Sequence, residues 1–240
     1  MQKLPVFILV ALVFGFGLAQ AQLFDKIKKK VGDAIGGDAV LSEKDAVAGL
    51  KEALIKGTNK SVDVLSVTDG YFGNPLVKIP FPESARKVEQ NLRRIGLGSQ
   101  VDDAILSMNR AAEDAASEAA AVFVAAVKDM TVEDAVGIVR GDSTAATQYL
   151  RRRTGDTLTA RFRPIIETSL AKVDATRYWE TAINSYNRIP LVEDVNPDLA
   201  AYVTDKALEG LFTLIAREEA EIRRDPLART SEILKKVFGR

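Results

Sequence analysis

Two groups of polar residues have the types and spacing that chemistry requires. The first lies within one helical turn and the second in a glycine- and proline-rich stretch; together they are Asn109, Arg110, Glu113, Asp69, Tyr71 and Asn74. Glu113 and Asp69 form a pair of carboxylates, the arrangement that general acid–base catalysis in a hydrolase or lyase uses. The six side chains could instead bind a polar ligand. The sequence favours a structural interpretation, in which the first group anchors the loop by hydrogen bonds and the second forms Asx-type turns.

The residue inventory excludes most other enzyme chemistry. The chain has no histidine and no cysteine, so it contains neither a Ser-His-Asp nor a Cys-His nucleophilic arrangement. The same absence excludes conventional zinc sites and carboxylate–histidine di-iron sites. The sequence has no glycine-rich phosphate motif after a strand pattern and no EF-hand spacing. We therefore expect no metal and no cofactor, and paired carboxylates are the one common catalytic arrangement that remains.

Two further charged clusters have structural interpretations: the first is typical of a solvated helix face, and the second of ion pairs within a helix. Five arginines that could grip an anionic group are spread round one predicted helix: Arg151, Arg152, Arg153, Arg161 and Arg163. The second cluster places acidic beside basic side chains: Glu218, Glu219, Glu221, Arg223 and Arg224. Its spacing predicts ion pairs within a single helix.

A heptad pattern predicts the helix that positions Asn109, Arg110 and Glu113. Across residues 101–130, apolar and small residues recur at alternating spacings of four and three: Val101, Ile105, Met108, Ala112, Ala115, Ala119, Val122 and Ala126. This pattern predicts one uninterrupted helix, roughly 45 Å long. Because alanine lets a neighbouring helix approach closely, we expect this helix to be the buried centre of a helical domain.

The glycine- and proline-rich stretch 69–82 precedes this helix and cannot be a regular helix itself. Its large apolar residues predict that it packs onto the helices. Those expected to be buried are Tyr71, Phe72, Leu76 and Ile79. A loop without a backbone ladder needs side-chain partners, so we expect Asn109 or Arg110 to satisfy its carbonyl groups.

Helical spacing dominates the rest of the chain, so the predicted class is all-α: a multi-helix bundle around a long alanine-rich central helix, with one packed loop. A capping box of Thr131 and Asp134 should begin a short helix that Gly141 ends. Pro164 should kink or restart a longer helix. The helices are expected over residues 42–57, 83–95, 101–130, 132–139, 145–170, 174–186, 197–222 and 226–238.

The N-terminus predicts export. An uncharged stretch, 4–24, follows Lys3 and includes the small-residue site Ala19-Gln20-Ala21, which is the pattern of a secretory signal peptide cut after Ala21. An uncleaved membrane anchor is the alternative. We predict a signal peptide over residues 1–21, a flexible basic arm over 22–41 and a single helical domain over 42–240, located in the periplasm. The arm has a basic amphipathic pattern that could touch a membrane surface through Phe24, Lys28, Lys29 and Lys30.

Several short motifs resemble one bacterial family. They are residues 49–54 (GLKEAL), 69–72 (DGYF), 77–80 (VKIP), 108–113 (MNRAAE), 145–147 (AAT) and 210–212 (GLF). In these the chain is similar to the domain of unknown function 4197 family over residues 42–239. The resemblance implies one domain in an exported protein of the Gram-negative cell envelope. Some members are lipoproteins, and the absence of cysteine separates the chain from that subset. The resemblance implies no activity and no catalytic residue.

Composition favours a non-enzymatic binding protein. The chain has 33 basic and 33 acidic residues, and this balance argues against nucleic acid as a partner. The export pattern, the alanine-rich helix and the lack of common catalytic residues favour an envelope protein that binds a protein partner or an apolar ligand. The alternative is a carboxylate-dependent hydrolase or lyase that uses Glu113 and Asp69, and it requires both carboxyl groups to face one solvent-reachable cleft.

Overall fold

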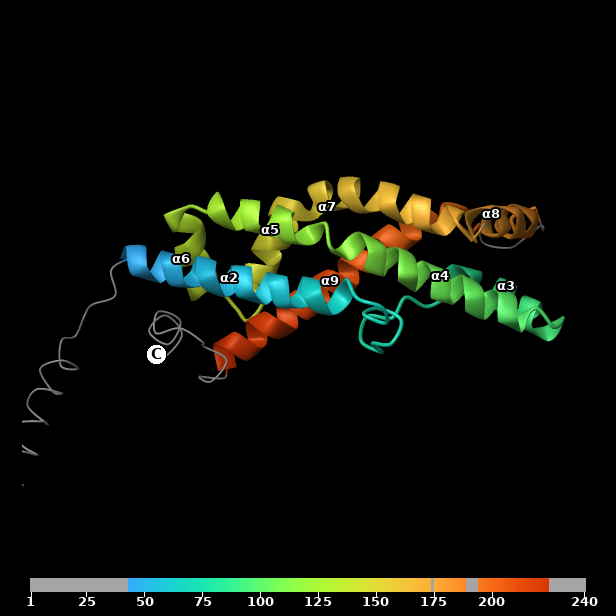
Figure 1. Ribbon diagram of the computed structural model, residues 1–240, viewed down its shortest axis with the longest axis horizontal. Helices are drawn as coiled ribbons and strands as arrows, with labels where there is room; N and C mark the ends of the chain where they lie inside the picture. The colour runs from blue at the N-terminus through green and yellow to red at the C-terminus, as the bar shows by residue number, and fades with distance from the viewer. Residues whose placement is uncertain (1–42, 174, 189–193, 225–240) are drawn as a thin grey trace, which may run out of the picture. The chain divides into compact units, whose positions relative to one another are not determined.

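The computed structural model describes residues 43–173, 175–188 and 194–224, and these residues are helical apart from turns and one long loop (Figure 1). The elements are α2 (Glu43–Leu65), the 3₁₀ helix η2 (Glu83–Ala85), α3 (Arg86–Arg94), α4 (Gly98–Ala116), α5 (Ala119–Lys128), α6 (Val132–Arg140), α7 (Ala145–Ala171), α8 (Ala175–Tyr186) and α9 (Leu199–Arg224). The described part of the chain contains no strand, and the prediction of an all-α multi-helix bundle is confirmed.

Two long helices, α7 and α9, connect the two ends of the bundle. They pack against each other, and both also contact α4. At one end α2 lies beside α5 and α6 (Figure 1). At the other end α3 lies beside α4, α8 lies beside α7, and α3 and α8 contact each other. The buried side chains form one hydrophobic core. Within it the rings of Phe123 and Phe212 meet edge to face, with their centroids 5.9 Å apart, which is a favoured aromatic geometry.

The predicted helix over 101–130 is two helices, α4 and α5. Most of its heptad seam is buried, but the helix is interrupted at Ser117 and Glu118. Both residues keep right-handed helical backbone angles, and the Glu118 N–H donates to the carbonyl of Ala115, three residues back. One tightened turn of this kind bends the path of the chain. The bend allows α4 to pack on α3 and α9 while α5 packs on α2.

The other helices differ from the prediction mainly at their ends. The capping box of Thr131 and Asp134 begins α6 as predicted, with both reciprocal hydrogen bonds 3.1 Å long. Helix α7 continues through Pro164 without a restart. Helix α2 continues past Gly57 to Leu65 and packs against α9. In α2, packing against a neighbouring helix thus outweighs the low helix propensity of Gly57.

Several predictions concern residues outside those that the structure describes. They are the signal peptide 1–21, the arm 22–41 with Phe24, Lys28, Lys29 and Lys30, and the last helix 226–238. Each of them stays a prediction.

Candidate functional site

The loop over residues 66–82, between α2 and η2, is held by Glu113 of α4. The backbone N–H groups of Tyr71 and Phe72 both donate to Oε1 of Glu113, each at 3.0 Å. Its other oxygen, Oε2, accepts from Arg110 Nη1 at 2.6 Å. The second terminal nitrogen of Arg110 donates to Asp69 Oδ1 at 2.8 Å. Glu113 is 4% exposed, so its charge is compensated almost entirely within the protein.

Asn109 holds the far end of the same loop. Its Oδ1 accepts from the N–H of Ile79, and its Nδ2 donates to the carbonyl of Ile79, both at 2.8 Å. The side-chain amide therefore pairs with both the N–H and the carbonyl of Ile79, as the backbone of a neighbouring strand would. Asn109 makes the expected contact with a loop carbonyl. Of the two residues expected to make this contact, Arg110 does not make it; its guanidinium binds the carboxylates of Asp69 and Glu113.

Tyr71 is the central side chain of the loop. Its ring is fully buried, and its hydroxyl donates to the carbonyl of Ala207 on α9 at 2.7 Å. Burial, together with the nearby charge of Glu113, raises the pKa of the Tyr71 phenol, so this group stays neutral. Gly210 makes room for the ring, since a Cβ at that position would lie 2.9 Å from Tyr71 Cε1. The tyrosine thus fixes the loop to α9 as well as to α4.

The remaining predicted loop residues have different surroundings. Asn74 Oδ1 accepts from the N–H of Leu76 at 3.2 Å, the expected Asx turn. Phe72 is half-buried, with the amine of Lys78 3.9 Å from its ring centroid. Leu76 was expected to be buried and is 50% exposed; Val77 is buried in its place. The reason is that Val77 packs at Gly210, where the missing side chain leaves space on α9.

This geometry holds a loop in place and engages both carboxylates in hydrogen bonds. Both oxygens of Glu113 are engaged, and using the carboxylate for proton transfer would release the loop. Asp69 lies on the solvent side, with a side chain 57% exposed, and pairs with the same arginine. Neither residue lines the cavity described below. The structure therefore brings four of the six candidate residues, Asp69, Tyr71, Arg110 and Glu113, into one hydrogen-bonded assembly that supports the loop. Asn109 supports the same loop separately, at Ile79.

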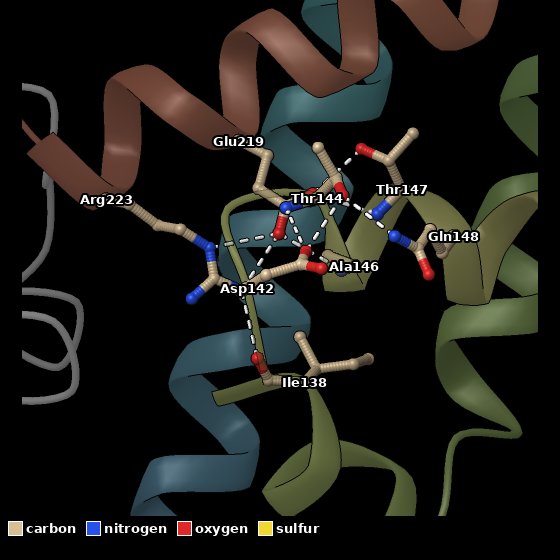
Figure 2. A network of polar contacts seen from close by, with 8 residues as sticks. All are labelled: Ile138, Asp142, Thr144, Ala146, Thr147, Gln148, Glu219 and Arg223. Carbon is tan, nitrogen blue, oxygen red and sulfur yellow. Dashed lines mark hydrogen bonds and ion pairs between the residues drawn. The ribbon is translucent and has the colours of Figure 1, made fainter. Parts of the chain in front are cut away.

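A second buried glutamate, Glu219 of α9, holds the start of α7 (Figure 2). Its Oε1 accepts from the N–H of Ala146 at 3.0 Å, and its Oε2 accepts from the N–H and the hydroxyl of Thr147 at 2.9 and 2.8 Å. Thr144, at the N-cap position of α7, makes no capping bond with its side chain; its hydroxyl donates to Asp142 and accepts from Gln148. A carboxylate from another helix therefore takes the place of the N-cap side chain, where a negative charge also favours the helix dipole.

Arg223 completes this second anchor. It donates to Glu219 Oε1 through Nε at 3.0 Å and Nη2 at 2.9 Å, and Nη2 also donates to the carbonyl of Ile138 at the end of α6. The pair thus joins the end of α6 to the start of α7. The predicted pairing within one helix is confirmed by the Glu219–Arg223 ion pair, but the burial of Glu219 and its bonds to α7 were not predicted. The available signal was its spacing, since Glu219 continues the apolar face of Phe212 and Ile215 at steps of three and four.

An apolar cavity of about 860 Å³ lies between α3, α4, α8 and the adjoining ends of α7 and α9. Its wall is formed largely by aliphatic side chains, among them Val88, Leu92, Val101, Met108, Ile183 and Leu199. Phe81 and Trp179 add a pair of aromatic rings that meet edge to face, with centroids 5.2 Å apart. The sequence does not mark this cavity, because its wall is assembled from separate helices whose apolar residues each resemble ordinary core positions.

A few charged and hydroxyl side chains also line the cavity. Asp103, Asp114 and Lys172 are exposed, and Arg110 is partly buried. Asp114 accepts from the hydroxyl of Ser169 at 2.6 Å. The described residues contain no cluster of three or more side chains that could hold a metal ion. None of the helices that the structure describes is both long and apolar enough to cross a membrane.

Comparison with known proteins identifies one related family. The family model described as "Protein of unknown function (DUF4197)" matches residues 40–239. The search of the curated proteins finds no match, and the search of the solved structures finds none either.

Proposed function

Since the chain belongs to the DUF4197 family of proteins of unknown function, we propose its function from the geometry of its cavity: it is an exported protein that binds an apolar ligand. The cavity between α3, α4 and α8 is the observation that carries this proposal. Its volume of about 860 Å³ lies in the range of roughly 300–1,000 Å³ that is usual for small-molecule sites. A mostly aliphatic wall with a few polar groups is also typical of such sites.

The export part of the proposal depends on the N-terminal sequence. A basic residue, an uncharged stretch and the site Ala19-Gln20-Ala21 support cleavage after Ala21. When the full chain is expressed in a Gram-negative host, we expect a periplasmic product that begins at Gln22. Mass spectrometry of the purified protein checks this, and a product that retains Met1 would support the membrane anchor instead.

Filling the cavity should abolish binding of an apolar probe. Ala104 lines the cavity from α4 and is partly exposed, so Ala104→Phe places a ring in the space that a ligand needs. We expect this variant to bind N-phenyl-1-naphthylamine, a neutral dye that fluoresces on leaving water, roughly tenfold more weakly or worse than the unchanged protein. Fluorescence titration measures the affinity, and circular dichroism checks that the helices are intact.

The matched control is Ala121→Phe on α5. Ala121 is exposed and does not line the cavity, so this variant adds the same ring elsewhere and should bind the dye as the unchanged protein does. Equal dye binding by both variants, or no dye binding by the unchanged protein, would contradict the proposed function.

A further inference from the structure

One buried polar atom, which belongs to a residue of the cavity wall, has no partner. Among the residues that the structure describes, Nε1 of Trp179 is the one buried side-chain nitrogen or oxygen without a hydrogen bond. Trp179 is 7% exposed and lines the cavity beside Phe81. An indole N–H can only donate, and in a buried tryptophan it usually finds an acceptor. The described residues offer this donor no acceptor, so a bound ligand could supply one.

The charges round the cavity indicate what kind of acceptor fits. Two carboxylates, Asp103 and Asp114, line it. Of the two cations that line it, Arg110 is already bound by Asp69 and Glu113. Only Lys172 has no carboxylate partner among the described residues. An additional carboxylate on the ligand would therefore meet more negative than positive charge, and a neutral acceptor would avoid this repulsion.

From the cavity and its unpaired donor we propose, extending the proposed function, that the ligand is a neutral acyl ester whose carbonyl oxygen accepts from Trp179 Nε1. The hydrocarbon chain then lies along the aliphatic wall formed by residues such as Val88, Met108 and Ile183. Protein atoms cover the indole nitrogen, so the ester reaches it as the indole turns in the cavity wall. Binding consequently changes the surroundings of the chain's one tryptophan.

Nuclear magnetic resonance of the ¹⁵N-labelled protein tests this contact directly. Because the chain has one tryptophan, its indole N–H gives one assignable signal. The probes are methyl decanoate, which carries an ester, and decane, which carries no acceptor. We expect methyl decanoate to move the indole proton signal downfield and decane to leave it without a downfield shift. A signal that responds equally to both probes overturns the inference.

Affinities complete the test. Competition against N-phenyl-1-naphthylamine gives the preference of the protein for methyl decanoate over decane. We expect Trp179→Phe, which keeps a ring but removes the donor, to lower this preference about tenfold, the factor that one hydrogen bond typically contributes. The control is Ser185→Ala, because Ser185 lies on the same helix as Trp179 but is exposed, does not line the cavity and donates to the carbonyl of Thr181 at 2.7 Å. The preference of this control variant for methyl decanoate over decane should equal that of the unchanged protein.

The outcomes separate the two proposals. If neither probe displaces the dye from the unchanged protein, the proposed function fails. If both displace it and the preference survives in Trp179→Phe, the cavity binds apolar ligands but the ester contact is wrong. Should Trp179→Phe fail to fold, the resonance shift in the unchanged protein still decides. Sodium decanoate should bind more weakly than methyl decanoate; tighter binding would refute the neutral head group.

Discussion

Replacing Glu113 with alanine should lower the free energy of unfolding by about 3–5 kcal/mol, the usual cost of removing one partner from a buried charged network. The substitution leaves the N–H groups of Tyr71 and Phe72 without their acceptor inside the protein, and each unsatisfied buried donor costs about 1–3 kcal/mol. Urea denaturation followed by circular dichroism measures the change. Limited proteolysis should show cleavage within residues 66–82 of the variant, because the loop has lost its main anchor.

Asp69→Asn is the control for this experiment, because Asp69 has a φ of 68° and asparagine, unlike alanine, tolerates this left-handed backbone. Asp69 binds the same arginine as Glu113, but its side chain is 57% exposed, and exposed ion pairs contribute about 0–1 kcal/mol. We therefore expect this variant to unfold nearly as the unchanged protein does and to keep its loop protected. Equal destabilisation by the two substitutions would mean that the guanidinium of Arg110, and not the backbone contacts of Glu113, holds the loop.

An effect of similar size, about 3–5 kcal/mol, is expected for Glu219→Ala. Five donors from three residues converge on this carboxylate: two backbone N–H groups, the hydroxyl of Thr147 and two nitrogens of Arg223. Without it the first turn of α7 loses its cap, and the partly buried charge of Arg223 loses its bidentate partner. Urea denaturation again measures the loss, and hydrogen exchange should show faster exchange at the amides of Ala146 and Thr147.

The matched substitution on the same helix is Glu209→Ala. Glu209 is exposed and pairs with Lys206, three residues away, so its removal should change the free energy of unfolding by less than about 1 kcal/mol. If the amides of Ala146 and Thr147 stay protected in Glu219→Ala, the start of α7 is held by packing alone and the capping role is refuted.

The sequence predicts those features whose cause lies in neighbouring residues. The all-α class follows from helical spacing, and the cap of α6 follows from Thr131 and Asp134, because both partners of the bond are within four positions. Asn109 was identifiable because a polar side chain within an apolar seam needs a partner, and a loop without a ladder needs one too.

Other features arise only when distant segments meet. Nothing in Ser117 and Glu118 marks the break between α4 and α5, which follows from the different helices that each half packs against. Val77 and not Leu76 is buried because of the space at Gly210, more than a hundred residues away. Glu219 pairs with Arg223 within α9, as the spacing predicts, but its bonds to the start of α7 join residues 73 and 72 positions apart. The cavity required the relative positions of at least four helices.

The 66–82 loop also has a consequence for folding kinetics. Helical proteins generally fold fast because most of their contacts are between residues close in sequence. This loop instead bonds to partners 30, 42, 122 and 136 positions away, namely Asn109, Glu113, Tyr202 and Ala207. It can dock only after α4 and α9 have come together, so we expect its contacts to form after the main folding barrier. Interactions of that kind slow unfolding while leaving the folding rate nearly unchanged, and the loop thereby governs the lifetime of the native state.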